Sequence, residues 1–320
     1  MSSRVAVVGY GVMGRYHAMN YASLPGAELV AVVDPDPDRR LSAQIELGVA
    51  AFTSVAALLA DGQVDAASVA TPTSLHYPVT KQLLTAGVHV LVEKPVATRV
   101  EEARELAELS RRKSVVLQVG HITRFYGSVE KLRSEVQQPY LIEARRLVAS
   151  TRVKDVGVIL DLMIHDIDIV LGLVTGDVVK VSAVGRCLNG SPHEDVAAAQ
   201  VVFEDGCIAR LLASRVAPDA ERSLLVAERE RTVRVDFAKE PYAELAVYRT
   251  PGQATSPGHV MLDRHVIHEE NPLKKELEHF LARQAGIAAP IGTLADDLRS
   301  LSLASRLLSE LRTAEGTLAV

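Results

Sequence analysis

The chain has 320 residues, of which 48% are hydrophobic and 23% charged, the profile of a globular protein long enough for two domains. Its net charge of −5, with no block of basic residues, argues against a nucleic-acid partner. No stretch has the pattern of a signal peptide or a membrane span, because the longest apolar run, 156–174, is interrupted by three aspartates and a histidine. We therefore expect a cytoplasmic protein that is not bound to a membrane.

The first 120 residues alternate short apolar runs with amphipathic helical patterns. Strands that are apolar along their whole length fit a parallel sheet covered by helices on both faces. Right-handed crossovers then give a doubly wound Rossmann fold. The predicted strands are 4–9, 28–34, 66–70, 88–92 and 115–119, and the predicted helices are 11–23, 38–47, 77–86 and 99–112.

After residue 120 the strands become longer and alternate in polarity, which predicts an α+β domain with a large, mostly antiparallel open sheet. One face of this sheet should meet solvent or a partner. We place the domain boundary at residue 121, giving domains 1–121 and 122–320. The predicted strands are 178–184, 195–203, 207–214, 222–227, 232–237 and 244–249, and the closing helices are 272–284 and 294–314.

The segment 9–14, GYGVMG, is a complete G-x-G-x-x-G between the first predicted strand and helix. Its glycines allow a tight turn, a close approach of the backbone to a pyrophosphate, and close packing of helix on strand. The free N–H groups at the start of the helix favour phosphate binding. The motif predicts a dinucleotide site. The residues expected to hold the pyrophosphate are Gly9, Gly11, Val12, Met13 and Gly14.

Asp34 ends the second predicted strand, about 20 residues after the last glycine of the motif. A carboxylate there accepts hydrogen bonds from the adenosine ribose and repels a 2′-phosphate, so we expect NAD rather than NADP. Arg39 and Arg40 could soften that preference or form a solvated helix face. The alternative for Asp34 is a helix N-cap before Pro35.

Lys94 follows the fourth predicted strand, at the end of the sheet where open α/β folds bind ligands. A lysine there can donate to a substrate oxygen, although a lysine at a strand end is often an ordinary surface residue.

A second polar group lies in the segment 160–168, LDLMIHDID. At 100° per residue, Asp161, His165 and Asp168 fall within about 60° on one face of a helix with apolar flanks. Burying them costs several kcal/mol unless they are paired or used. A carboxylate four residues before His165 would fix its tautomer and raise its basicity, as oxidation of an alcohol by NAD requires of a base.

A buried polar network or a helix cap is the alternative to catalysis for these residues. A metal site is disfavoured because no second cluster of ligands completes a coordination shell, and we predict none. The two cysteines, Cys187 and Cys207, also lack the spacing of a zinc site. We expect them to be small, buried, reduced thiols, with a disulfide as the alternative.

Together these motifs resemble the glucose–fructose oxidoreductase/inositol dehydrogenase family (Gfo/Idh/MocA) over nearly the whole chain. The resemblance implies an NAD-binding domain over 1–121 and a substrate-binding domain over 122–320 that assembles homodimers or homotetramers through its sheet. It rests on VVGYGVMG (7–14), VATPTSLH (69–76), HVLVEKP (89–95), VGHITRF (119–125) and DLMIHDID (161–168).

The same resemblance implies roles for individual residues. On the cofactor side, Thr71, Pro72 and His76 would line the nicotinamide path, and Glu93 and Lys94 would contact the cofactor. On the substrate side, Asp161 and His165 would be the catalytic pair, with Lys94 on the reacting hydroxyl. An inter-domain salt bridge is the alternative for Arg124. The residues expected to bind substrate are Lys94, His121, Arg124, Arg152, Asp161 and His165.

A narrower resemblance joins GHITRF, EARRL (143–147) and 154–168 to family members that oxidise the 3-hydroxyl of UDP-N-acetylglucosamine. Arg145, Arg146 and Arg152 would then serve the diphosphate, or else be exposed charges. We expect an NAD-dependent dehydrogenase that moves hydride between NAD and a secondary hydroxyl of a sugar or nucleotide sugar. The alternatives are a dehydrogenase of free cyclitols or aldoses from the same family and a non-enzymatic NAD-sensing regulator.

Overall fold

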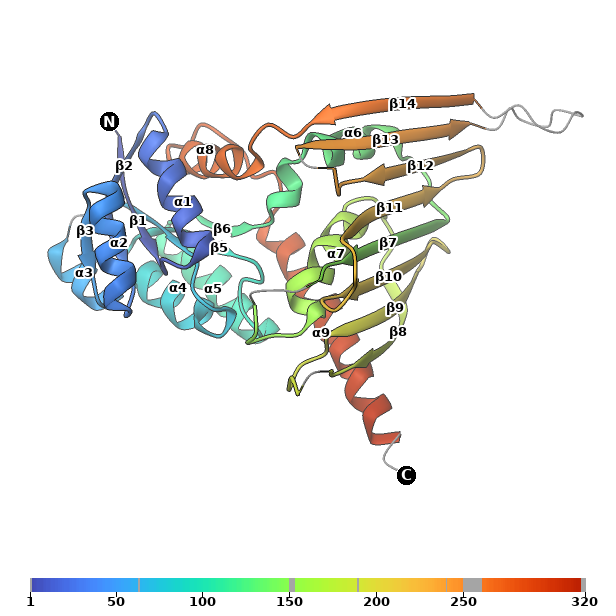
Figure 1. Ribbon diagram of the computed structural model, residues 1–320, viewed down its shortest axis with the longest axis horizontal. Coiled ribbons are helices and arrows are strands. Elements are labelled where there is room, and N and C mark those ends of the chain that lie inside the picture. The colour runs from blue at the N-terminus through green and yellow to red at the C-terminus, as the bar shows by residue number, and fades with distance from the viewer. Residues whose placement is uncertain are drawn as a thin grey trace, which may run out of the picture. The chain divides into compact units, whose positions relative to one another are not determined.

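The computed structural model of the chain (Figure 1) describes residues 2–62, 64–149, 153–188, 190–239, 241–249 and 261–317, with side chains as far as Leu311. The chain divides into two compact units. Unit 1 comprises Met1–Ile122 and Asn271–Leu298, and unit 2 comprises Thr123–Glu270 and Arg299–Val320. The chain therefore leaves unit 1, builds most of unit 2, and returns to unit 1 near its end.

Unit 1 contains strands β1 (Ser3–Val8), β2 (Ala27–Val33), β3 (Ala50–Phe52), β4 (Ala66–Val69), β5 (His89–Glu93) and β6 (Leu117–Gly120). They form one parallel sheet in the order β3-β2-β1-β4-β5-β6. The order reverses between β1 and β4, the point at which such folds bind dinucleotides. The predicted Rossmann fold is confirmed.

The helices of unit 1 are α1 (Val12–Ser23), α2 (Pro37–Leu47), α3 (Val55–Asp61), α4 (His76–Thr85), α5 (Val100–Lys113) and α8 (Pro272–Gln284), with the 3-10 turn η1 (Thr73–Leu75) before α4. Asp36 caps α2, because its side chain accepts from the backbone N–H groups of Asp38 and Arg39. The sequence did not predict β3 and α3, since a three-residue strand is too short to show a pattern.

Helix α8 completes the core of unit 1. Its buried residues Leu273, Leu277 and Phe280 recur at helical spacing and pack in one cluster with residues of β1, including Val5 and Val7. The boundary expected at residue 121 lies beside the first division of the chain. The expectation that all of 122–320 forms a single domain does not fit this core, because Asn271–Leu298 belongs to unit 1.

Unit 2 contains strands β7 (Leu141–Leu147), β8 (Val178–Arg186), β9 (Val196–Phe203), β10 (Ile208–Ser214), β11 (Glu221–Ala227), β12 (Arg231–Asp236), β13 (Tyr242–Arg249) and β14 (Met261–His268). The sheet order is β14-β13-β12-β11-β7-β10-β9-β8. Only the pair β7–β10 is parallel among these described strands, so the predicted mostly antiparallel sheet is confirmed. Strand β14 was not predicted, because its residues are exposed or half-buried on both sides.

The helical elements of unit 2 pack on one face of this sheet. They are α6 (Gly127–Glu135), the π-helical turn η3 (Ile159–Met163), α7 (Ile164–Leu171) and most of α9 (Leu294–Thr317), while η2 (Ile122–Phe125) spans the boundary. Helix α6 contacts β12, β13 and β14, and α7 contacts β7. On the other face, each of the eight described strands contributes one residue to a row in which neighbours are register partners. From β8 to β14 these residues are Ser182, Gln200, Arg210, Glu143, Leu225, Arg234, Ala246 and Arg264.

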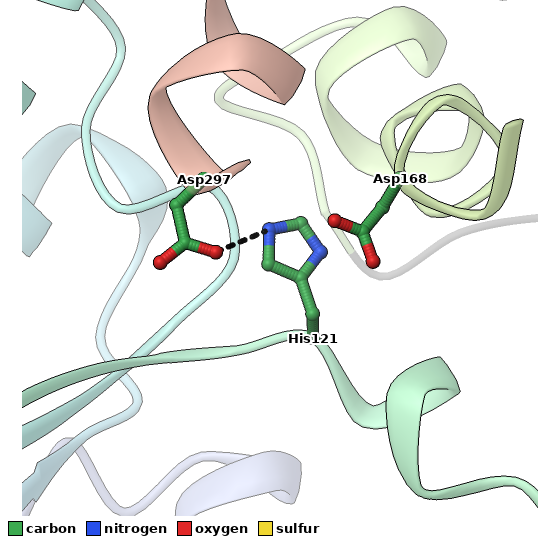
Figure 2. A group of neighbouring side chains, drawn as sticks. All are labelled: His121, Asp168 and Asp297. Carbon is green, nitrogen blue, oxygen red and sulfur yellow. Dashed lines mark ion pairs between the residues drawn. The ribbon is translucent and has the colours of Figure 1, made fainter. Parts of the chain in front are cut away.

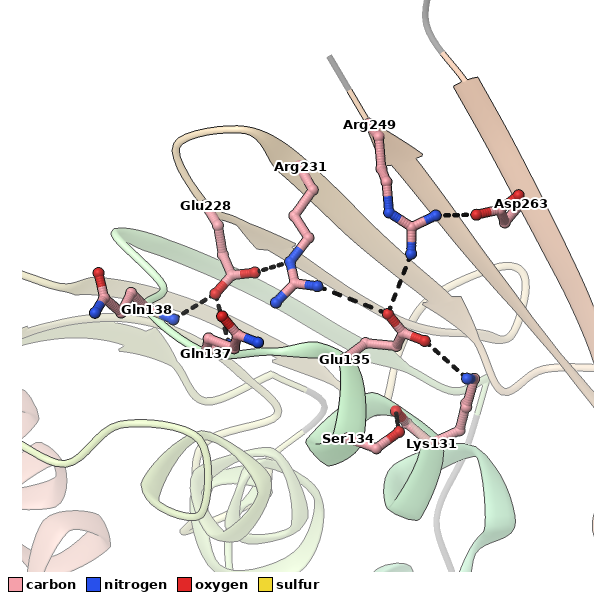
Figure 3. Close-up of polar contacts among 9 residues, drawn as sticks. All are labelled: Lys131, Ser134, Glu135, Gln137, Gln138, Glu228, Arg231, Arg249 and Asp263. Atoms are coloured by element: carbon pink, nitrogen blue, oxygen red, sulfur yellow. Dashed lines mark hydrogen bonds and ion pairs between the residues drawn. The ribbon is translucent and has the colours of Figure 1, made fainter. Parts of the chain in front are cut away.

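A network of ion pairs joins α6 to the strands beneath it (Figure 3). Glu135, at the end of α6, lies 2.7 Å from Lys131, 3.7 Å from Arg231 and 3.5 Å from Arg249. Glu228 accepts from Arg231 and from the backbone N–H groups that follow α6. Although burial opposes ionisation of Glu228, these donors lower the pKa of its carboxyl group.

Two sequence expectations concern properties of the whole chain. Across the described ranges, no helix combines the length and the apolar character needed to span a bilayer. Neither cysteine forms a disulfide within the described residues. Cys207 is a buried thiol, as expected, whereas Cys187 is exposed, so the expectation of burial is wrong for Cys187. Burial raises the pKa of Cys207 to about 11.

Candidate active site

The glycine turn of unit 1 depends on the absence of side chains. Gly9 has φ +89°, and a Cβ there would lie 2.7 Å from the carbonyl oxygen of Ala70 at the end of β4. A Cβ on Gly14 would lie 1.7 Å from the carbonyl oxygen of Gly9. Gly11 is the N-cap of α1, so the amides of Val12 and Met13 stand in its first turn. The turn thus offers a backbone cradle and a helix N-terminus to a pyrophosphate.

Asp34 lies directly after β2, as expected, and is 2% exposed. Its carboxylate accepts from the backbone N–H of Tyr10 at 2.7 Å and from that of Asp36 at 2.9 Å. Asp34 therefore holds the glycine turn in place, a role that the sequence did not reveal. The helix cap is Asp36 and not Asp34. Arg39, half exposed, lies 3.6 Å from the Asp34 carboxylate.

The loop after β4 carries Thr71 and Pro72, and His76 is the first residue of α4. The Thr71 hydroxyl is buried and makes no hydrogen bond to any described residue. His76 is buried, with Nδ1 2.7 Å from the Pro95 carbonyl oxygen and Nε2 3.0 Å from that of Thr71. Burial lowers the pKa of His76, partly offset by these two carbonyl groups. The neutral imidazole has one N–H and donates to one of these two carbonyl oxygens, so the ring lies between the loop after β4 and the loop after β5.

Glu93 and Lys94 stand at the end of β5. Glu93 accepts from Nε2 of His17, at 2.9 Å, and Lys94 is half-buried. Burial raises the pKa of Glu93, but the hydrogen bond and charge of His17, with Lys94 nearby, lower it further than burial raises it. The sequence analysis did not identify His17. A histidine three residues after Gly14, on the buried face of α1, is the signal that could have indicated a buried polar contact.

These features fit NAD. The cradle at Gly9 and Gly14 would be filled by any Cβ, and the buried Thr71 hydroxyl has an unused donor and acceptor. Both lie at the switch point of the sheet, between β1 and β4. The carboxylate of Asp34 disfavours a 2′-phosphate beside it.

In unit 2, Asp161 and His165 lie on the continuous segment Ile159–Leu171, formed by η3 and α7. Asp161 is 5% exposed and His165 is half-buried. The sequence predicted an ordinary α-helix at 100° per residue, whereas the first five residues form a π-turn. Such π-helical turns are frequent at functional sites.

Glu194 caps this segment, and the sequence reasoning missed it because an isolated acid before a strand has no local pattern. Its Oε1 accepts from the backbone N–H of Ile159 at 3.0 Å, and its carbonyl accepts from Val158 at 3.1 Å. Gly157 makes room for it, since a Cβ there would lie 2.0 Å from the Glu194 carboxylate. Arg215 holds the preceding stretch by donating to the carbonyl oxygen of Val156 at 3.0 Å.

The two remaining aspartates of the segment are bound by arginines. Asp168 accepts from Nε and Nη2 of Arg124 at 2.9 and 2.5 Å, and Ser300 donates to it at 3.2 Å. Asp166 accepts from Arg146 at 3.0 and 2.6 Å. Burial lowers the pKa of Arg146, but Asp166 raises it by more. The Arg124–Asp168 pair is a buried salt bridge, but both residues belong to unit 2, so it is not the inter-domain salt bridge expected as the alternative for Arg124.

Two of the arginines expected to bind a diphosphate, Arg145 and Arg146, do not lie on the same face of the sheet. Arg145 and Arg146 are consecutive on β7, so their side chains leave opposite faces of the sheet. Arg145 is half exposed and pairs with Glu221 at 2.9 Å. Arg152 lies outside the described residues. His121, directly after β6, lies 3.8 Å from Asp297 within unit 1, and both side chains are buried (Figure 2).

Comparison with known proteins decides the family. Residues 3–121 match an oxidoreductase family with an NAD-binding Rossmann fold, and residues 123–236 match the GFO/IDH/MocA C-terminal domain. The chain belongs to the Gfo/Idh/MocA family. It is 38% identical over 257 residues to UDP-N-acetylglucosamine 3-dehydrogenase of Acidithiobacillus ferrooxidans, covering 80% of this chain and 79% of that protein. It is 31% identical to scyllo-inositol 2-dehydrogenase (NAD+) of Bacillus subtilis over 67% of this chain and 68% of that one.

Solved structures agree with this assignment. A structure of the Acidithiobacillus ferrooxidans UDP-N-acetylglucosamine 3-dehydrogenase has a TM-score of 0.87 at 32% identity, covering 98% of this chain and 99% of that one. A 3-ketoreductase from Actinomadura kijaniata also reaches 0.87, at 18% identity over 97% and 98% of the two chains, which shows the fold alone. The chain is thus an NAD-dependent oxidoreductase of this family, as the motifs predicted.

Proposed function

We propose that this oxidoreductase acts on a nucleotide sugar and moves hydride between the 3-hydroxyl of UDP-N-acetylglucosamine and NAD. One observation carries the proposal: the likeness to UDP-N-acetylglucosamine 3-dehydrogenase extends over 98% of the chain and so through unit 2, the unit expected to bind substrate. The unit also retains the capped segment with its buried Asp161 and half-buried His165.

Bound NAD would supply the nicotinamide carbon that accepts hydride. Gly9, Gly14 and Asp34 would hold its pyrophosphate and ribose. In this mechanism His165 takes the proton of the reacting hydroxyl as general base, and Asp161 orients its imidazole. Lys94 donates a hydrogen bond to the reacting oxygen and favours its negative charge as the proton leaves.

The test is formation of NADH from NAD+ and UDP-N-acetylglucosamine by the purified protein. Lys94→Ala and His165→Ala should each lower kcat by about 100-fold or more while NAD still binds, since each removes a group that acts on the reacting hydroxyl. Lys113→Ala, at the exposed end of α5, is the matched control and should retain wild-type kcat. Undiminished turnover in both active-site variants would contradict the mechanism.

A free cyclitol is the second candidate substrate, favoured by the 31% identity to scyllo-inositol 2-dehydrogenase. Inhibition by UDP alone separates the two candidates. UDP should compete with the substrate if the site recognises a nucleotide sugar, and it should not affect oxidation of a cyclitol.

We also propose that the chain forms a homodimer or homotetramer through the open face of the unit 2 sheet. Val184 and Val266 are 64% and 69% exposed there, amid ion pairs such as Arg210–Glu143. Apolar side chains among complementary charges suit a self-complementary interface. Light scattering should give a multimer for the wild type and a smaller species for Val184→Lys. Ile287→Lys, at an exposed position of unit 1, should leave the mass unchanged.

A further inference from the structure

A histidine lies where the apolar face of α1 would ordinarily continue. Gly14, His17, Ala18 and Tyr21 form the buried stripe of this helix, and His17 is 0% exposed. Burial of an imidazole is unfavourable unless it is hydrogen-bonded. The partner of His17 is Glu93, at the end of β5.

The protonation of this pair follows from its surroundings. The pKa of Glu93 is lowered, since His17 outweighs the opposing effect of burial, so its carboxylate is ionised near neutral pH and only accepts. Nε2 of His17 must therefore carry the proton. Nδ1 of His17 makes no hydrogen bond to any described residue, so Glu93 is the hydrogen-bond partner that orients the ring.

Glu93 is confined from its other side as well. It lies directly opposite Gly120 of β6, and a Cβ on Gly120 would lie 3.3 Å from the Glu93 Cα and 3.4 Å from its carboxylate carbon. The Glu93 side chain therefore lies between His17 of α1 and the backbone of β6. Because the Glu93 carboxylate is held on both sides, the backbone of Glu93 has little freedom to move.

The residue after Lys94 is held in a comparable way. Nδ1 of His76 lies 2.7 Å from the carbonyl oxygen of Pro95, and the same ring reaches Thr71 through Nε2. Lys94 thus stands between two residues that buried imidazoles hold: Glu93 through its side chain and Pro95 through its main chain.

We propose that His17 and His76 are positioning residues for Lys94: acting from α1 and α4 through Glu93 and Pro95, they set the place from which the lysine amine meets the reacting oxygen. This inference rests on the proposed function, in which Lys94 contacts that oxygen. Misplacing a catalytic group by about 1 Å can cost about 100-fold in rate, so small shifts of this segment matter.

The variants follow from the atoms involved. His17→Leu removes the donor to Glu93, whereas His17→Gln keeps an amide N–H in the place of Nε2. Tyr21→Phe is the matched control, because Tyr21 lies one turn later on the same buried stripe and its hydroxyl bonds Ser68 at 2.9 Å, away from Lys94. All variants are first compared by thermal melting, so that loss of folding is recognised.

We expect His17→Leu to lower kcat about 10- to 100-fold with the KM for NAD changed less than about threefold. His17→Gln should recover most of the loss, and Tyr21→Phe should retain wild-type kcat. In a Lys94→Ala background, His17→Leu should lower the remaining kcat by less than about threefold, because its effect passes through the missing amine. A full loss in that background, or an equal loss in Tyr21→Phe, would overturn the proposal.

A measurement without turnover separates this inference from the proposed function. Exchange of the amide hydrogens of Glu93, Lys94 and Val96 should be faster in His17→Leu and in His76→Leu than in Tyr21→Phe. Faster exchange without oxidation of any sugar in the wild type would refute the proposed function and leave the two histidines as anchors of this segment. Equal exchange in all variants would refute the anchoring itself.

Discussion

Gly157→Ala should detach the cap of the segment that carries Asp161 and His165. The new Cβ would lie 2.0 Å from the Glu194 carboxylate, so that side chain must turn away and release the N–H of Ile159. A buried N–H without a partner costs about 1–3 kcal/mol. For a unit of about 150–250 residues, the range into which unit 2 falls, that corresponds to a fall in Tm of roughly 2–12 °C.

A double-mutant cycle tests this reasoning. Glu194→Ala alone should lower the free energy of unfolding by a similar amount, because the N–H of Ile159 loses the same acceptor. Adding Gly157→Ala to it should then cost little, since the obstructing carboxylate is gone, giving a coupling energy of at least about 1 kcal/mol. Urea denaturation measures all four proteins. If Gly157→Ala were neutral alone, or if the two losses simply added, the assigned contact would be wrong. kcat should fall together with stability in Gly157→Ala, because Asp161 and His165, the proposed catalytic pair, shift.

Asp34→Ser should lower the ratio of kcat/KM for NAD over NADP at least about tenfold, measured with both cofactors, since the carboxylate that repels a 2′-phosphate is removed. Because folding lowers the pKa of Glu228, its ionised carboxylate stabilises the fold above about pH 4.5. This contribution is lost as pH falls through the folded-state pKa. On acidification, the urea midpoint of Glu228→Gln should therefore fall less than that of the wild type. A thiol reagent at pH 8 should modify Cys187 and not Cys207, whose pKa of about 11 and burial keep it protonated; two fast equivalents would contradict this.

The sequence predicted the features that depend on local pattern. Continuous apolar strands indicated the parallel sheet, and the spacing of Asp34 from the glycine turn indicated the cofactor. The closing helix at 272–284 was predicted with its observed bounds, yet its membership of unit 1 was not, because periodicity reveals which face is buried and not what buries it.

Contacts between distant residues were beyond local pattern. The Glu194 cap joins residues 35 positions apart, and the His17–Glu93 pair joins residues 76 positions apart. Arg146 was considered for phosphate binding because its type suits that task, but Asp166 occupies both arms of its guanidinium group. The type of side chain therefore predicted candidate binding residues. Only the fold showed which of them are held by an ion-pair partner within the protein.

The return of α8 to unit 1 also has a consequence for how the protein is made. Three buried side chains, Leu273, Leu277 and Phe280, stabilise unit 1 by roughly 4–9 kcal/mol, comparable with the whole stability of a domain. A ribosome supplies them only after nearly all of unit 2 has been synthesised. Until then unit 1 lacks part of its core. A chain that ends at residue 122 should therefore depend on chaperones rather than fold into a separate NAD-binding domain.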